Sequence, residues 1–254
     1  AAPVTRYLGR SVRAGAGVHV RAVSGEFDGV RVELYGPGAE VLSPDLERKL
    51  EAALFREDFA RARGDRMGTM TFWPGAEEAY LSDVFSRSDH AAIHQRGFRV
   101  AVACDVRDQA LIERWLSRLG CFVTLGQPGE HGVPVDIGLV LEPGTERLTL
   151  FDERGIRIED RVLDALEFLM WLEHPETPSK VVIPVGASKV IDELARQRQR
   201  EVSRGKSPAS LSLGGFPLVT RVLQWMARDA AKLSDLIAGI PESRMVERTS
   251  PCPW

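Results

Sequence analysis

Apolar residues recur along this chain with two periods, one typical of strands and one typical of helices. The first part predicts a helix around Val4 to Val12, then strands at Val18 to Val23 and Val30 to Tyr35. The loop from Ser24 to Gly29 separates the two strands. The chain is therefore predicted to begin with a helix and a pair of strands.

A helix is predicted after this pair, because Ser43 and Pro44 form a typical helix start. A serine side chain accepts a free N–H group of the first turn, and proline at the first helical position lacks such a group. Gly64 is the predicted stop, and a further short helix is expected from Glu77 to Phe85. The apolar stripe of the first of these helices consists of Leu46, Leu50, Leu54 and Phe55.

The pattern is clearest after residue 97, where it predicts a strand, a helix and a second strand. The strands are Phe98 to Cys104 and Cys121 to Leu125, and Gly120 is the predicted cap of the helix between them. Such a unit is expected to have a right-handed crossover. The apolar positions of its helix are Leu111, Ile112, Trp115, Leu116 and Leu119.

Two apolar runs, Ile137 to Leu141 and Leu148 to Phe151, flank a six-residue Pro-Gly turn, Glu142 to Arg147. The pattern predicts a strand, a charged loop and a strand. If Glu142 and Glu146 converge, their oxygens suit a hard cation such as Mg²⁺. The alternative is an ordinary hairpin whose tip is polar because it is solvated.

A second strand-helix-strand pattern follows a helix that Asp160 is predicted to cap. It consists of a strand at Lys180 to Val185, a helix at Lys189 to Gln197 and a short strand near Glu201 to Ser203. The region from Leu218 to Ile240 is helical and amphipathic. The predicted fold class is therefore α/β, with repeated three-layer α/β/α units.

Composition and charge exclude several classes of function. The 254 residues carry a formal net charge of -3, so no global field favours nucleic acid or an anionic membrane as a partner. No apolar run approaches the length of a membrane span. The three cysteines are too few and too scattered for a disulfide framework or a zinc site, which predicts a reduced, cytoplasmic protein.

Several stretches in order resemble the α-D-phosphohexomutases, the family of phosphomannomutase and phosphoglucomutase. Gly17 to Val20, Gly29 to Val32 and Leu42 to Pro44 resemble the elements around the phosphoserine loop of that family. Phe98 to Leu125 resembles the opening of its second domain, and Val135 to Gly155 resembles its metal loop with the strand that follows. The resemblance implies a hexose phosphate as ligand and Mg²⁺ as cofactor.

The resemblance also implies a domain organisation. Residues 1–95 would form a partial first domain, 96–176 a second domain with a degenerate metal loop, and 177–254 a shortened third domain, with the fourth domain absent. Lys49 to Gly68 is similar to the mutase-like half of bacterial mannose-1-phosphate guanylyltransferase fusion proteins. A nucleotidyltransferase domain is therefore expected in the same chain or in a partner chain, and the first half of domain one upstream of Ala1.

The serine loop departs from the family pattern, T-A-S-H-N-P. The matching residues are Arg21 to Glu26, which places Val23 at the position of the serine and makes Ser24, one residue later, the candidate phosphoacceptor. Valine has no oxygen that can accept a phosphoryl group. The resemblance makes Arg21 a candidate substrate-binding residue.

The metal loop departs as well, since the pattern D-x-D-G-D-R falls on Glu142 to Arg147. Its outer carboxylates are Glu142 and Glu146, and its middle position is Gly144. Because Mg²⁺ requires near-ideal octahedral geometry, weak or lost binding is expected. Arg147 keeps the geometry for a bidentate phosphate contact and is the second candidate substrate-binding residue.

Three hypotheses follow from these residues. The first is a catalytically degenerate phosphohexomutase-like module, which serves as a binding or regulatory part of a sugar-nucleotide enzyme. The second is an active Mg²⁺-dependent phosphohexomutase that interconverts hexose 1-phosphate and hexose 6-phosphate through Ser24. The third is an unrelated α/β binding protein.

Overall fold

The structure is a computed structural model, and it describes residues 1–23, 29–40, 42–58, 60–129, 132, 134–144, 147–172, 179–183, 185–205 and 215–241. Two compact units emerge. The first consists of Ala1–Ser86 with Pro143–Glu146, and the second of Arg87–Glu142 with Arg147–Trp254. The division into three domains that the sequence suggests stays a prediction.

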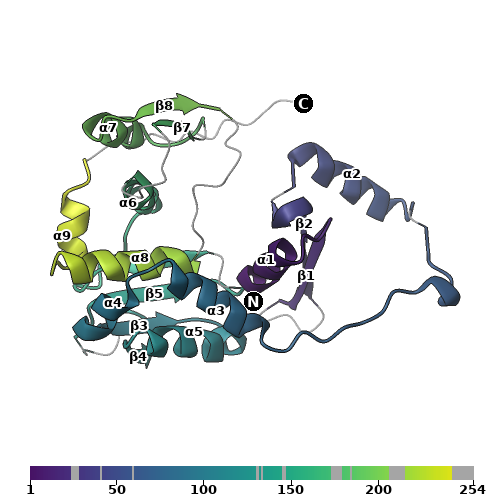
Figure 1. Ribbon diagram of the computed structural model, residues 1–254, viewed down its shortest axis with the longest axis horizontal. Coiled ribbons are helices and arrows are strands. Elements are labelled where there is room, and N and C mark those ends of the chain that lie inside the picture. The colour runs from purple at the N-terminus through teal and green to yellow at the C-terminus, as the bar shows by residue number, and fades with distance from the viewer. Residues whose placement is uncertain are drawn as a thin grey trace. The chain divides into compact units, whose positions relative to one another are not determined.

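The first unit contains the predicted helix and strand pair. β1 (Gly17–Ala22) pairs antiparallel with β2 (Val30–Tyr35), and α1 (Ala2–Ser11) precedes them (Figure 1). A hydrogen bond of 2.9 Å joins Thr5 Oγ1 on α1 to His19 Nδ1 on β1. The helix therefore packs against the face of the strand pair that carries His19.

In this strand pair the apolar face is exposed and the polar face is covered, which is the reverse of a usual surface sheet. Val18 lies opposite Leu34, and Val20 lies opposite Val32. These four side chains share one face and are 41–58% exposed. Polar pairs occupy the face toward α1, namely His19 with Glu33 and Arg21 with Arg31. The apolar face is thus left open to solvent in the part of the chain that the structure describes.

The helix predicted to start at Ser43 is α2 (Pro44–Phe55), and Ser43 Oγ accepts a hydrogen bond from the Leu46 N–H at 3.3 Å. The predicted stop at Gly64 is wrong, because the helix ends at Phe55. Glu57 follows with a φ of 52°, which leaves the helical path. None of the described residues of α2 is buried, so no tertiary packing extends it.

Three short elements complete the first unit, η1 (Pro37–Ala39), η2 (Gly64–Arg66) and α3 (Ala76–Ser86). The α3 helix confirms the prediction from Glu77 to Phe85. Its Tyr80 ring lies 5.8 Å from the Tyr7 ring of α1, and its Leu81 side chain is fully buried. The small core of this unit therefore lies between α1 and α3.

The second unit contains a four-stranded sheet. Its strands lie in the order β4 (Phe122–Leu125), β3 (Arg99–Ala103), β5 (Ile137–Leu141) and β6 (Leu148–Phe151). β3 runs parallel to β4 and β5, whereas β6 runs antiparallel to β5. α5 (Val106–Arg118) connects β3 to β4, which confirms the predicted strand-helix-strand unit. The predicted strand, loop and strand around residues 142–147 is confirmed by the pairing of β5 with β6.

An aromatic stack joins α5 to α8 (Gly215–Arg228) in the core of this unit. The Trp115 ring lies parallel to the Phe216 ring with centroids 4.2 Å apart. Trp115 Nε1 donates to Thr220 Oγ1 at 3.1 Å, so the buried indole N–H has a partner. The contact packs α8 against α5.

The second predicted strand-helix-strand pattern is also present. It comprises β7 (Lys180–Ile183), α7 (Lys189–Gln197) and β8 (Glu201–Arg204), and β7 and β8 are parallel. The remaining helices of the second unit are α4 (His90–Arg96), α6 (Asp160–Leu172) and α9 (Leu233–Ala238). The predicted linker at residues 174–178 lies outside the described residues.

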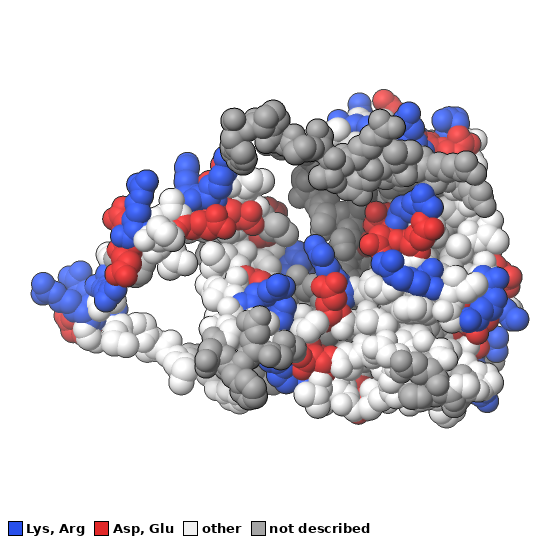
Figure 2. Space-filling view, turned by 180° about the vertical axis from the view of Figure 1, so that it is seen from behind, with Lys and Arg blue, Asp and Glu red and all other residues white. Residues whose placement is uncertain are grey.

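Charged side chains of both signs are interspersed on the face that Figure 2 shows, in keeping with the small net charge. None of the helices that the structure describes combines the length and the apolarity needed to cross a membrane.

A turn after β6 depends on one buried carboxylate. Asp152 is 1% exposed and accepts hydrogen bonds from the backbone N–H groups of Arg154 and Ile156, at 3.0 and 2.9 Å. The Arg154 guanidinium adds contacts of 2.8 and 2.6 Å. Burial of Asp152 opposes ionisation, but these donors outweigh it and hold the pKa of the carboxyl below its usual value.

We expect Gly120→Ala to destabilise the second unit more than Gly129→Ala does. Both glycines have positive φ, 77° and 88°, so both variants carry backbone strain of about 1–2 kcal/mol. A Cβ on residue 120 would also lie 2.8 Å from His94 Cα, whereas at residue 129 no atom of the described residues lies within 4 Å of it. The clash should add about 1–3 kcal/mol, measured by urea unfolding. Equal losses of unfolding free energy in the two variants would contradict the predicted clash with His94.

Asp152→Asn should lower the free energy of unfolding at pH 7 by about 1–3 kcal/mol, because the amide replaces an ionised acceptor. The folded pKa of Asp152 is lowered, so its stabilising contribution is present above the usual aspartate pKa of about 3.9 and is lost as pH falls below it. The two proteins should therefore converge in stability in strong acid. A constant difference from pH 7 to pH 2, measured by denaturant unfolding, would contradict the assignment.

Candidate functional site

The loop between β5 and β6 holds the predicted metal ligands. Leu141 pairs with Leu148, and the Glu142 N–H donates to the Arg147 carbonyl oxygen at 3.0 Å, which closes the base of the loop. The side chains of Glu142 and Arg147 are exposed. Glu146 lies outside the described residues, so its convergence with Glu142 stays a prediction.

Gly144, at the middle of this loop, belongs to the first unit. It is buried with a φ of 97°, and its carbonyl oxygen accepts a hydrogen bond from the Ala2 N–H at 3.2 Å. A Cβ at this position would lie 3.4 Å from Arg21 Nε. The guanidinium of Arg21 therefore lies directly beside the middle position of the predicted metal loop.

Arg21 projects from β1 into largely buried surroundings. Its side chain is 16% exposed, and its Nε lies 3.6 Å from Glu33 Oε1, an ion-pair distance too long for a hydrogen bond. Among the residues that the structure describes, none accepts a hydrogen bond from the buried Nε–H. Tyr35 donates to the other Glu33 oxygen at 2.9 Å. A buried guanidinium donor without an acceptor is suited to contact an anionic ligand.

The candidate phosphoacceptor Ser24 lies outside the described residues. The ends of its loop are described, and the Val23 N–H donates to the Gly29 carbonyl oxygen at 2.8 Å. Arg21 is on the strand that leads into this loop. The role of Ser24 stays a prediction.

The described residues do not fit a Mg²⁺ ion. Within them, no group of three or more His, Cys, Asp or Glu side chains is placed to hold a metal. Gly144 offers no carboxylate, and the adjacent Arg21 guanidinium repels a divalent cation. Of the two predicted ligands, only the exposed Glu142 is described.

Two aspartates flank the loop strands and act as structural acceptors. Asp136 Oδ2 accepts from the Arg99 N–H at 2.8 Å, and Asp152 accepts the donors described above. Both aspartates lie in the stretch Val135 to Gly155 that resembles the metal loop, and no role was predicted for Arg154 from the sequence. The Asp-x-Arg spacing could have indicated this turn, because a short acidic side chain in a turn accepts hydrogen bonds from the N–H groups of the following residues.

Comparison with known proteins shows distant relatives. No family model matches the chain. It is 25% identical over 245 residues to a phosphoglucosamine mutase of Rhizobium rhizogenes, which covers 87% of this chain and 53% of the relative. A phosphoglucosamine mutase of Agrobacterium fabrum is 27% identical over 197 residues, 66% of this chain and 42% of the relative. The chain thus spans about half the length of these curated relatives.

Solved structures show the same relationship in the fold. A putative phosphomannomutase from Thermus thermophilus matches with a TM-score of 0.71 at 13% identity, over 94% of this chain and 65% of that one. A phosphoglucomutase/phosphomannomutase family protein from Burkholderia thailandensis matches with a TM-score of 0.66 at 12% identity, over 90% and 59% of the two chains. The chain is therefore distantly similar in sequence to α-D-phosphohexomutases and shares the mixed α/β fold of part of such proteins.

Proposed function

We propose that the chain is a phosphohexomutase-like module that binds a hexose phosphate and has lost most or all of the mutase chemistry. The observation that carries this proposal is the position of the Arg21 guanidinium against Gly144. Phosphoryl transfer requires neutralisation of charge by a metal or by cationic clamps around a positioned nucleophile. Here Gly144 stands at the middle position of the loop in place of a carboxylate, so a metal ligand is missing there, and the Arg21 guanidinium lies beside it.

The electrostatics of this position favour an anion. The buried Arg21 Nε–H lacks an acceptor within the described part of the chain, and a phosphate oxygen would supply one. Glu33 faces Arg21 but is itself held by the Tyr35 hydroxyl. Arg147 is a further predicted phosphate-binding residue. A binding or regulatory role in a sugar-nucleotide enzyme, with a nucleotidyltransferase domain in the same or a partner chain, is part of the same proposal.

The relatives suggest which hexose phosphates to test. Several are named phosphoglucosamine mutases, so glucosamine 6-phosphate is an appropriate ligand beside mannose 1-phosphate. The alternative, an active Mg²⁺-dependent mutase with Ser24 as phosphoacceptor, is supported by the extent of similarity to these named enzymes. A mutase assay with Mg²⁺ and a sugar bisphosphate primer separates the two functions. Turnover that disappears in Ser24→Ala would establish the alternative.

Arg21→Ala should weaken binding of glucosamine 6-phosphate by about tenfold or more, because a charge-assisted hydrogen bond contributes about 1.5–3 kcal/mol. Isothermal titration calorimetry measures the change. Arg66→Ala is the matched control, since it removes the same charge from an exposed position of the same unit. Identical affinities of the two variants would exclude Arg21 from the binding site.

Gly144→Asp and Gly144→Asn separate charge from backbone strain at the middle loop position. Both side chains have similar shape and both tolerate positive φ better than most residues. The aspartate would pair with Arg21 and compete with the phosphate, whereas the asparagine would not. We expect weaker hexose phosphate binding in Gly144→Asp than in Gly144→Asn by calorimetry. Stronger binding in the Gly144→Asp variant, dependent on added Mg²⁺, would favour the metal-dependent alternative.

A further inference from the structure

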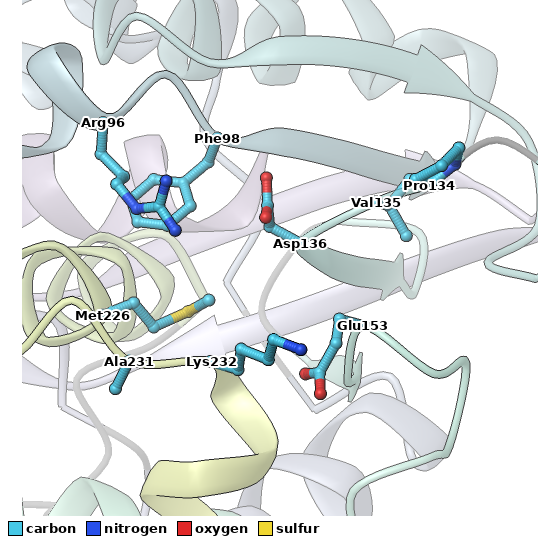
Figure 3. A pocket seen from close by; sticks show the side chains of 9 residues that line it. All are labelled: Arg96, Phe98, Pro134, Val135, Asp136, Glu153, Met226, Ala231 and Lys232. Atoms are coloured by element: carbon cyan, nitrogen blue, oxygen red, sulfur yellow. The ribbon is translucent and has the colours of Figure 1, made fainter.

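A separate pocket of about 260 Å³, lined by apolar and charged side chains, lies within the second unit (Figure 3). Phe98 immediately precedes β3, and Asp136 immediately precedes β5. Glu153 follows β6, which runs antiparallel to β5. These three residues therefore lie at one edge of the sheet, where the parallel strands begin.

This edge is distinct from the Glu142–Arg147 loop. Asp136 and Glu142 lie at opposite ends of β5, which spans Ile137–Leu141. At about 3.3 Å per residue, an extended strand places their backbones roughly 20 Å apart. A ligand in the pocket would not contact Glu142.

Apolar side chains form the floor of the pocket, and two cationic side chains, Arg96 and Lys232, also line it. Phe98 and Met226 are each 1% exposed. The Arg96 guanidinium lies 5.7 Å from the centroid of the Phe98 ring, and the Lys232 side chain extends across the pocket toward Glu153 (Figure 3). Among the residues that the structure describes, neither Arg96 nor Lys232 forms an ion pair. Their donors are available to a ligand.

Two carboxylates complete the pocket, and the fold holds both in place. Asp136 Oδ2 accepts from the Arg99 N–H at 2.8 Å. Glu153 accepts from the Ser234 hydroxyl at 2.6 Å and from the Ser234 N–H at 3.3 Å. A carboxylate has about four acceptor positions, so each keeps capacity for another donor. The pocket therefore presents two fixed anions and two cations without ion-pair partners.

We propose that this pocket binds a small zwitterion of the amino acid class, in which a short carbon skeleton joins an ammonium to a carboxylate. The charges of Arg96, Lys232, Asp136 and Glu153 sum to zero, so a ligand with no net charge and two separated charges is complementary. A lone anion would meet repulsion from Asp136 and Glu153, and a lone cation would meet repulsion from Arg96 and Lys232. The apolar floor receives the carbon skeleton.

The size of the pocket agrees with this class. Its volume lies below the range of about 300–1,000 Å³ that is typical of sites for drug-sized ligands. A molecule such as 6-aminohexanoate has the required ammonium, carboxylate and apolar stem. Hexanoate and hexylamine each lack one of the two charges and keep the stem, so they serve as matched half-ligands.

The test is an NMR titration of the intact chain with 6-aminohexanoate, hexanoate and hexylamine, followed at the backbone amides of Arg99 and Ser234. We expect 6-aminohexanoate to bind at least tenfold more tightly than either half-ligand. Lys232→Met should reduce its affinity about tenfold, because it removes a charge and keeps the length of the side chain. Lys189→Met removes the same charge from an exposed position on α7 and should leave the affinity unchanged.

Equal affinities for 6-aminohexanoate and hexanoate would overturn the assignment of a zwitterion. Equal effects of Lys232→Met and Lys189→Met would overturn the assignment to this pocket. Arg21→Ala should leave the binding of 6-aminohexanoate unchanged, since Arg21 belongs to the other unit. The failure of this proposal and the failure of hexose phosphate binding at Arg21 are therefore measured separately.

Discussion

The burial of β5 is the constraint on which the second unit depends. The strand is hydrogen-bonded on one side to β3 in parallel and on the other to β6 in antiparallel register. Ile137 and Leu139 are fully buried. A slip of one residue would place a larger side chain at the position of Gly138, where even a Cβ would lie 2.5 Å from Pro128 Cβ, so the register is strongly specified. The same register fixes Asp136 at the start of the strand and Glu142 at its end.

Three charged residues differ in how far the fold uses their hydrogen-bonding capacity, and this difference separates a structural role from a binding role. Asp152 has donors on both oxygens and is fully used by the turn that it holds together. Arg21 is largely buried as well, but its Nε–H has no acceptor among the residues that are described. Lys232 is exposed and lies beside a pocket. Satisfaction of hydrogen bonds, more than charge alone, separates the structural residue from the two available to a ligand.

Local patterns predicted most of the secondary structure. The helix with Trp115 and Leu116 was predictable because its apolar residues recur with helical spacing, and the start of α2 was predictable from the cap at Ser43. The end of α2 was not, because it is set at Phe55 by a backbone turn and not by a glycine. The distant relationship to phosphohexomutases was also recognisable from the order of the motifs.

The candidate sites were less accessible to prediction. The position of Arg21 beside Gly144 brings together residues far apart in the chain, and no local pattern encodes it. The pocket near β3 and β5 likewise combines Arg96, Glu153 and Lys232 from three separate segments. The sequence singled out Ser24 and Glu146, whose roles stay predictions because both lie outside the described residues. The sequence therefore indicated the two candidate loops, whereas the structure was needed to show which residues from distant segments lie near one another.

The strand pair of the first unit, with its exposed apolar face, is expected to unfold locally before the sheet of the second unit does. Its valine face is exposed, so burial contributes less to holding β1 and β2 than to holding β3 and β5. Segments with few buried apolar contacts open at lower free energy than the core of a protein does. Amide hydrogens of β1 and β2 should then exchange with solvent sooner than those of β5. The chain would lose its order in stages, so a single midpoint of thermal unfolding would describe only the second unit.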